Sequence, residues 1–285
     1  MQRLSTIAEW RAYAQSMRDV GRRVGVVPTM GALHDGHLSL VRRARDNGDV
    51  VVLTSFVNPR QFSDPGDLAG YPRTPEADGE LAAAAGVNAF VTPSLREMWP
   101  EHPRPTLTTV SVGELAAPLE GVGRPGHFDG VASVVAKLLV VTGPARAYFG
   151  EKDFQQLVVV RRMVRDLGFD VEVVGCATLR GEDGLALSSR NARLSAPGLE
   201  RATALSRALR AAATSRSRPS GCRKIMREVM ESAGVDVAYA DVVDVETLTP
   251  LGDDVRGRGR AVVAGFVEGV RLIDNVEIDF ETGGD

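Results

Sequence analysis

Short apolar runs alternate with amphipathic segments along the first two thirds of the chain. Runs rich in β-branched residues predict strands at 24–27, 49–56, 87–92, 145–149 and 171–174. Apolar residues at helical spacing predict helices at 38–46, 76–85, 130–141 and 155–167. Strands that alternate with helices are typical of a parallel, doubly wound α/β sheet. Ligands of such sheets bind at the carboxyl ends of the strands, so we expect functional loops there.

The last third of the chain has a different pattern. It predicts helices at 198–213 and 223–233, separated by a polar, proline-containing stretch at 214–221. Strands are predicted at 236–245 and 260–267, with a further strand at 270–280. We therefore expect two domains: a Rossmann-like domain at 1–180 and a smaller C-terminal α+β domain at 181–285.

Composition narrows the class of protein. The 285 residues are 44% hydrophobic and 25% charged, which is ordinary for a soluble globular chain. A net charge of −3 shows no basic excess, which argues against nucleic-acid binding. No apolar run approaches the ~20 residues that span a bilayer, and residues 1–10 lack the apolar core of a signal peptide. The two cysteines have no ligand spacing, so we expect reduced thiols in a cytoplasmic protein.

The segment His34-Asp35-Gly36-His37 lies between the first predicted strand and the first predicted helix. A helix N-terminus offers N–H groups and a positive dipole end to anions. Two imidazoles there can donate hydrogen bonds to phosphate oxygens as charge develops on a leaving group. A lone histidine at a turn is more often structural, but the pair favours attack at the α-phosphate of a nucleoside triphosphate. The spacing, with no cysteine or carboxylate cluster, disfavours zinc.

Two further loops carry polar side chains after predicted strands or before predicted helices. Asn58 and Gln61 follow the second strand, and their amides suit a small ligand with hydroxyl and carboxylate groups. The alternative is that Asn58-Pro59 merely turns the chain. Arg124 and His127 precede the helix at 130–141, where they suit either a charged contact to substrate or a loop with a helix cap.

Two more loops carry cations. In the segment 150–153, Lys152 can reach phosphates and Asp153 can bond a ribose hydroxyl, unless the segment is only a solvated helix start. The adjacent Gln155 and Gln156 face different directions, so at most one is expected to line a pocket. The segment 183–191 supplies two serines and Arg190, either as a mobile phosphate clamp or as a hinge linker. The chain has no Walker-type loop, and no Gly-x-Gly-x-x-Gly opens the first helix.

Taken together, these segments resemble the pantothenate synthetase (pantoate–β-alanine ligase) family, of the cytidylyltransferase-like superfamily with the His-x-Gly-His motif. The similar segments, in the order and spacing of the family, are residues 28–37, 56–62, 71–74, 124–130, 149–156 and 183–191. The resemblance covers residues 25 to 195, and the C-terminal third is similar in length and character more than in motif. The chain departs from the family pattern at Ala177, Gly181, Leu187, Ala192 and Arg193.

The resemblance implies a two-step reaction. Pantoate attacks the α-phosphorus of ATP, with Mg²⁺ as the accompanying ion, and gives pantoyl adenylate and pyrophosphate. The amine of β-alanine then displaces AMP to form pantothenate. The smaller domain would act as a lid that excludes water from the adenylate. The family also implies a homodimer, with no nucleic-acid or membrane partner.

The resemblance also implies residue roles. The implied ATP site consists of Met30, Gly31, Ala32, Leu33, His34, Asp35, Gly36, His37, Gly150, Glu151, Lys152, Asp153, Leu179, Leu187, Ser188, Ser189 and Arg190. The implied catalytic residues are His37, the proton donor, together with His34, Lys152, Ser188, Ser189 and Arg190. Gln61 and Gln156 would bind pantoate, with Gln61 bordering the β-alanine site, and Asn58 and Arg124 would also contact substrate. The sequence assigns no metal ligand and leaves open whether Glu151 or Asp153 helps to bind magnesium.

Two other functions fit part of the pattern. A related nucleotidylyltransferase, which keeps the nucleotide on its product, fits the two-histidine motif equally well. The amides of Gln61 and Gln156, which suit a small hydroxy acid, favour the ligase. A catalytically silent nucleotide-binding protein is disfavoured because His34, His37, Lys152 and Arg190 are all present.

Overall fold

The computed structural model describes residues 1–280 and divides into two compact units. Unit 1 comprises residues 1–151 and 156–177. Unit 2 comprises residues 152–155 together with the chain from residue 178 onward.

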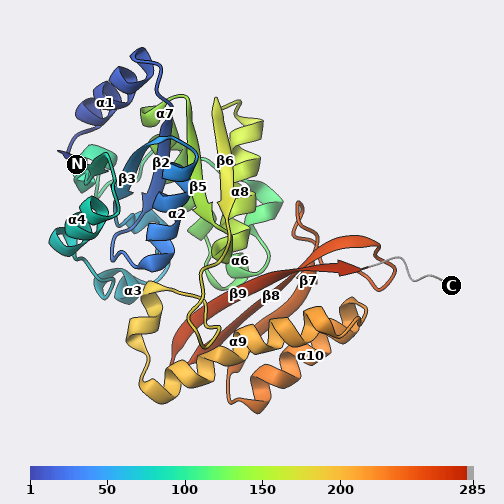
Figure 1. The fold of residues 1–285 in the computed structure, drawn as a ribbon. Coiled ribbons are helices and arrows are strands. Elements are labelled where there is room, and N and C mark those ends of the chain that lie inside the picture. Colours follow the sequence, from blue (N-terminus) through green and yellow to red (C-terminus); the bar gives the residue numbers. More distant parts are fainter. Residues whose placement is uncertain (281–285) are drawn as a thin grey trace. The chain divides into compact units, whose positions relative to one another are not determined.

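Unit 1 is built on a parallel sheet of six strands (Figure 1). The strands are β1 (Gln2–Leu4), β2 (Val24–Thr29), β3 (Val50–Ser55), β4 (Ala89–Val91), β5 (Ala145–Gly150) and β6 (Val171–Cys176). Their order, β1-β4-β3-β2-β5-β6, reverses direction at β2, because β3 lies on one side of it and β5 on the other. The carboxyl ends of β2 and β5 therefore flank the switch point where ligands of such sheets bind. The expected doubly wound parallel sheet is confirmed.

Helices surround this sheet. The longer ones are α1 (Ile7–Asp19), α2 (Asp35–Asp46), α4 (Pro75–Ala84), α7 (His127–Thr142) and α8 (Phe154–Asp166). The shorter helices are α3 (Pro65–Ala69), α5 (Leu95–Met98), α6 (Glu120–Gly123), and the 3-10 turns η1 (Pro59–Gln61), η2 (Gly113–Ala116) and η3 (Glu151–Asp153). Helix α2 packs against β2, β3 and β5, while α7 packs against β2 and β5. The central strands β2 and β3 are buried along most of their length, which explains why they read as continuous apolar runs.

Unit 2 contains an antiparallel sheet in the order β7-β8-β9. Its strands are β7 (Asp236–Val243), β8 (Gly257–Val267) and β9 (Val270–Phe280), so the strand expected at 270–280 is confirmed. Helices α9 (Ala196–Thr214) and α10 (Pro219–Ser232) contact each other and the sheet along one side (Figure 1). The core between these helices and the sheet includes Leu205, Leu209, Met226, Val263 and Leu272. The 3-10 turn η4 (Ser189–Arg193) precedes α9.

Two segments differ from the expectation. At the N-terminus, β1 pairs with β4, and α1 begins with a reciprocal cap between Thr6 and Glu9. In unit 2, the stretch at 214–221 was expected to separate two helices, but α10 already begins at Pro219. Proline fits the first position of a helix, since the N–H that it lacks would have no partner within the helix there.

Among the described residues 1–280, no helix is both long and apolar enough to cross a membrane.

Candidate active site

The two motif histidines cap the N-terminus of α2, after a short loop that follows the carboxyl end of β2. His34 is the N-cap residue, and its Nδ1 accepts a hydrogen bond from the Gly36 N–H at 3.1 Å. The Nδ1 of His37 accepts from the His34 N–H at 3.4 Å, and the two ring centroids lie 4.1 Å apart. Because both Nδ1 atoms are acceptors, the neutral rings carry their proton on Nε2. The cap therefore makes each Nε2–H a donor suited to an anion at the helix N-terminus.

The loop between β2 and the histidines has a left-handed backbone. Gly31 has a φ of +82° and Ala32 a φ of +50°. Asp78 of α4, whose exposed fraction is 2%, accepts hydrogen bonds from the N–H groups of Ala32 at 3.0 Å and Leu33 at 2.8 Å. A Cβ at Gly31 would lie 2.9 Å from the Asp78 carboxylate, so only glycine fits there. Asp78 holds the loop that carries the histidines, and its own position in an alanine-rich helix gives no sequence signal of this role.

Gln61 is oriented by Asn58, at the carboxyl end of β3. The Asn58 side chain, 1% exposed, donates to Gln61 Oε1 at 3.0 Å and to the Gly130 carbonyl at 3.1 Å. Its Oδ1 accepts from Trp99 Nε1 at 3.1 Å. Because Asn58 donates to the oxygen of the Gln61 amide, the NH₂ end of that amide points away from Asn58. Gln61 is thereby prepared to donate a hydrogen bond to a ligand.

The N-terminal turn of α7 holds the η1 turn from a second direction. A Cβ at Gly130 would lie 2.2 Å from the Arg60 carbonyl oxygen, so the close approach requires glycine. His127 Nδ1 lies 2.7 Å from the Gln61 carbonyl oxygen, and Arg124 Nη1 lies 3.2 Å from His127 Nε2. A guanidinium only donates, so Nε2 accepts and Nδ1–H donates to Gln61. The structure thus brings Arg124 beside Gln61, and it assigns His127 a holding role that the sequence did not indicate.

In unit 2, three of the expected phosphate contacts line one pocket. Lys152, Ser188 and Arg190 line it together with Asn191, Arg271 and Asp274, and its apolar lining includes Leu185 and Leu205. Ser188 is the N-cap of η4, and its Oγ accepts from the Arg190 N–H at 3.3 Å. The cations of Lys152 and Arg190 suit a polyphosphate, whereas the Arg271 guanidinium lies over the rings of Tyr239 and Phe266. Arg271 was not expected from the sequence, because it lies inside a strand.

The segment before Ser188 is a small hairpin. Leu187 N–H donates to the Leu179 carbonyl at 3.0 Å, and Gly181 N–H donates to the Leu185 carbonyl at 2.9 Å. Gly184, with a φ of +84°, closes the turn through its N–H to the Gly181 carbonyl at 2.9 Å. The departures from the family pattern at Gly181 and Leu187 therefore lie in a turn closed by backbone hydrogen bonds and one isolated β-bridge, between Arg180 and Ala186.

The expected site residues are divided between the two units. Unit 1 holds Met30, Gly31, Ala32, Leu33, His34, Asp35, Gly36, His37, Asn58, Gln61, Arg124, Gly150, Glu151 and Gln156. Unit 2 holds Lys152, Asp153, Leu179, Leu187, Ser188, Ser189 and Arg190. Of the two neighbouring glutamines, Gln155 is buried and Gln156 is half-buried.

Comparisons with known proteins agree with the family resemblance described above. A family model described as Pantoate-beta-alanine ligase matches residues 2–277. The chain belongs to the pantoate–β-alanine ligase family. Among curated members, the pantothenate synthetase of Cereibacter sphaeroides is 50% identical over 279 residues, covering 96% of this chain and 99% of that protein. The pantothenate synthetase of Paracoccus denitrificans is 50% identical over 278 residues, covering 95% of this chain and 96% of that protein.

Solved structures of family members have the same fold. The pantothenate synthetase of Thermus thermophilus matches with a TM-score of 0.90 at 47% identity, covering 99% of this chain and 100% of the other. The pantoate–β-alanine ligase of Francisella tularensis, complexed with β,γ-ATP and β-alanine, matches with a TM-score of 0.81 at 33% identity. That alignment covers 99% of each chain.

The carboxylates beside Lys152 are of the type that can accompany magnesium bound to a nucleotide. Among residues 1–280, no group of three or more His, Cys, Asp or Glu side chains is arranged to hold a metal. Magnesium keeps several waters and is usually held by one or two carboxylates together with substrate phosphates. Glu151 and Asp153, on either side of Lys152, are carboxylates of this kind.

The cysteine of unit 1 is not a nucleophile. Cys176, at the end of β6, is buried, and its burial raises the pKa of the thiol to about 11. A thiol with this pKa stays protonated at neutral pH. The raised pKa therefore gives no support to Cys176 as a reactive thiolate.

Proposed function

We propose that this chain catalyses the ATP-dependent condensation of pantoate with β-alanine. Pantoate attacks the α-phosphorus of ATP and releases pyrophosphate, and the amine of β-alanine then displaces AMP from the pantoyl adenylate. The observation that carries the proposal is the paired cap of His34 and His37, which makes two Nε2–H donors at the N-terminus of α2. Family membership supports the choice of substrates.

Each half of the reaction has residues suited to it. His37 donates to the phosphates as negative charge moves onto the leaving pyrophosphate, and His34 supports the same charge. Lys152, Ser188, Ser189 and Arg190 hold the phosphates in unit 2. No protein nucleophile is needed, because the carboxylate of pantoate attacks directly and charge stabilisation supplies the acceleration.

The amides hold the acid substrate. Gln61, prepared as a donor by Asn58, binds the hydroxyl or carboxylate oxygens of pantoate, and Gln156 supplies a second contact. Arg124, which lies beside Gln61 through His127, offers a cation to a substrate carboxylate. Asn58 acts by holding Gln61, since its own amide is 1% exposed.

The wider features of the family belong to the same proposal. Mg²⁺ would be bound through the ATP phosphates with help from Glu151 or Asp153 and would neutralise charge on them. The active species is proposed to be a cytoplasmic homodimer. That the C-terminal domain acts as a lid stays a prediction.

Pantoate-dependent exchange of labelled pyrophosphate into ATP tests this function. The assay contains magnesium and no β-alanine, so only the first half-reaction runs. We expect exchange with pantoate and none without it, followed by AMP release when β-alanine is added. ATP binding without pantoate-dependent exchange would refute the proposed substrate. A product that retains AMP would instead identify a nucleotidylyltransferase.

A further inference from the structure

Two consecutive buried polar residues interrupt the apolar pattern of β9, the last strand of the unit 2 sheet. Asp274 and Asn275 are 3% and 4% exposed, and they lie in a strand whose buried neighbours include Leu272 and Ile278. Successive side chains of a strand point to opposite faces. Asp274 is therefore on the face of Leu272 and Ile278, which α9 and α10 cover, and Asn275 is on the other face.

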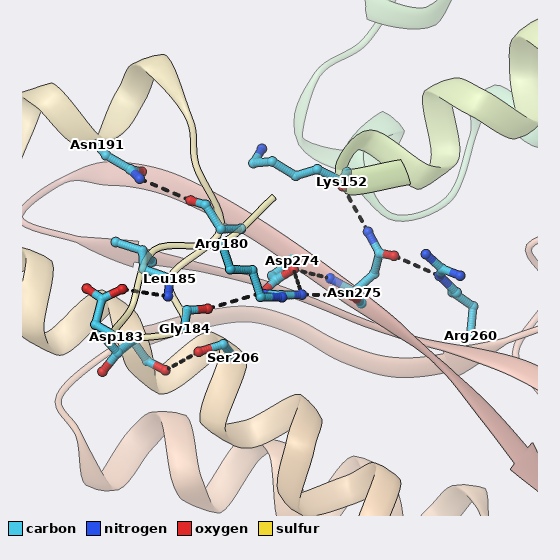
Figure 2. Close-up of polar contacts among 12 residues, drawn as sticks. Lys152, Arg180, Asp183, Gly184, Leu185, Asn191, Ser206, Arg260, Asp274 and Asn275 are labelled. Carbon is cyan, nitrogen blue, oxygen red and sulfur yellow. Dashed lines mark hydrogen bonds and ion pairs between the residues drawn. The ribbon is translucent and has the colours of Figure 1, made fainter. Parts of the chain in front are cut away.

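Asp274 anchors the hairpin that leads to Ser188. Arg180, which forms an isolated β-bridge with Ala186 in the hairpin, donates from Nη1 to Asp274 Oδ2 at 2.6 Å and from Nη2 to Oδ1 at 2.9 Å (Figure 2). Nη1 also donates to the Gly184 carbonyl at 3.2 Å, so one guanidinium holds both the side and the turn of the hairpin. A bidentate ion pair of this kind fixes the orientation of the arginine side chain as well as its distance from the carboxylate. It thereby fixes the starting point of the segment 187–190.

Asn275 anchors the main chain of Lys152. Its Nδ2 donates to the Lys152 carbonyl at 2.8 Å, and its Oδ1 accepts from Arg260 Nε at 2.7 Å (Figure 2). Because Arg260 only donates, the oxygen of the amide must face Arg260 and the NH₂ must face Lys152. The Arg260 guanidinium lies 4.4 Å from the centre of the Phe154 ring, which holds it in place. The backbone from which the Lys152 side chain extends is thus tied to β9.

We propose that Asp274 and Asn275 are positioning residues that together set the spacing between Lys152 and the segment 187–190. This inference rests on the proposed function, because it concerns how the candidate phosphate contacts are held. Lys152, Ser188 and Arg190 line one pocket with Asp274, and both of their chain segments are tied to neighbouring residues of one strand. Arg180 neutralises the Asp274 carboxylate, so that the pocket keeps its attraction for anions.

Substitution of Asn275 tests the part of the proposal that concerns the position of Lys152. In Asn275→Asp, one oxygen can still accept from Arg260, but the other opposes the Lys152 carbonyl where a donor stood. We expect the dissociation constant for ATP, measured by calorimetry with magnesium chloride and no pantoate, to rise by about 10-fold, because a displaced phosphate contact is lost. The KM for pantoate should stay unchanged. Glu277→Gln, an exposed carboxylate-to-amide change two residues along the same face, is the matched control and should leave both values unchanged.

A double-mutant cycle with Lys152→Ala separates positioning from simple structural support. If Asn275 acts through Lys152, Asn275→Asp should weaken ATP binding by less than about 2-fold in the Lys152→Ala background. A merely structural role would lower the melting temperature and would weaken binding equally in both backgrounds. Arg180→Lys provides a second variant, which keeps the charge but loses the bidentate geometry, and it should also weaken ATP binding selectively.

The outcomes are distinct. The positioning role is overturned if Asn275→Asp and Arg180→Lys, both folded, bind ATP as tightly as Glu277→Gln does. It is also overturned if the Asn275→Asp effect is the same with and without Lys152. Wild-type protein that binds ATP but shows no pantoate-dependent exchange would overturn the proposed function. The ATP affinities of the variants would still decide the positioning role of Asp274 and Asn275.

Discussion

His34 and His37 each use Nδ1 to accept a backbone N–H, so the helix cap and the ligand donor are opposite edges of one ring. The orientation is fixed before substrate arrives, because the cap is part of the fold. Donors that are already aimed at a developing charge require no reorganisation during the reaction. The same residues therefore start the helix and, in the proposed function, bind the phosphates.

Replacing His37 separates these two roles. His37→Ala should reduce the rate of pantoate-dependent pyrophosphate exchange by about 10²–10³-fold, or roughly 2.7–4 kcal/mol, by analogy with the loss of one oxyanion donor. His37→Asn is the matched variant, because its Oδ1 can still cap the helix while the Nε2–H donor is lost. We expect it to lose as much exchange as His37→Ala but to retain more of the melting temperature. Near-normal exchange in His37→Ala would refute the role of this residue.

Asn58 offers a second prediction for a single residue. Asn58→Ala leaves the Trp99 indole N–H and the Gly130 carbonyl without their buried partner, which costs about 1–3 kcal/mol of unfolding free energy. The KM for pantoate should also rise, because Gln61 loses its orientation. Urea unfolding and steady-state kinetics measure the two effects. Gln15→Ala, an exposed amide on α1, is the control, and an unchanged KM for pantoate in Asn58→Ala would contradict the link to Gln61.

At the scale of elements, helix ends carry much of the positioning. Helix α2 is capped by a motif histidine, and α9 is capped by Ser195, whose Oγ accepts from the Gly198 N–H at 3.1 Å. Glu268, in the turn between β8 and β9, accepts from the Ser195 hydroxyl at 2.6 Å and from its N–H at 2.9 Å. The start of α9 is thereby joined to the sheet that it covers.

The contacts between Glu268 and Ser195 should weaken in acid. The hydrogen bonds from the Ser195 hydroxyl and N–H hold the pKa of Glu268 below its ordinary value of 4.5, with Arg201 acting in the same direction. A folded-state pKa below the unfolded one stabilises the protein above the unfolded value, and this is lost as the pH falls through the folded value. The melting temperature of Glu268→Gln should therefore be lower than that of wild type near neutral pH, and the difference should shrink at about pH 3. A difference that persists unchanged in acid would contradict this account.

Some helices and strands could be predicted from the sequence, and others could not. The strands at 24–27 and 49–56 and the helix at 155–167 were predictable because the apolar pattern along each segment follows its burial. Helix starts were less predictable: the segment at 214–221 has the composition of a linker, yet Pro219 begins α10. The start of α1 was missed although Thr6 and Glu9 have the spacing of a reciprocal cap.

At the scale of the whole molecule, the contacts that the sequence did not predict join residues far apart in the chain. Asp78 reaches Ala32 across 46 positions, Arg180 reaches Asp274 across 94, and Asn275 reaches Lys152 across 123. Local motifs indicated roles for the histidines, Gln61 and Lys152, and these roles stay predictions. The motifs did not indicate the supporting residues, because an aspartate or asparagine in a strand or helix has no local pattern that names a distant partner.

The two cysteines provide one reporter for each unit. Cys176 belongs to unit 1 and Cys222 to unit 2, and burial raises the pKa of both thiols. Both should react very slowly with a thiol reagent at about pH 8 in the native protein, since little thiolate forms. In Cys222→Ser and Cys176→Ser variants, the remaining thiol should become reactive only as its own unit unfolds in urea. Rapid labelling of either variant without denaturant would contradict the burial of that thiol.

The cap of α2 and the contact of His127 with Gln61 set opposite tautomers in one protein. His34 and His37 carry the proton on Nε2, whereas His127 carries it on Nδ1. Ring nitrogens that bear a proton and those that do not have widely separated ¹⁵N resonances. A long-range ¹H–¹⁵N spectrum of the protein labelled at histidine would therefore distinguish the rings of His34 and His37 from the ring of His127 without any ligand. The spectrum would also show directly which ring loses its pattern when substrate binds.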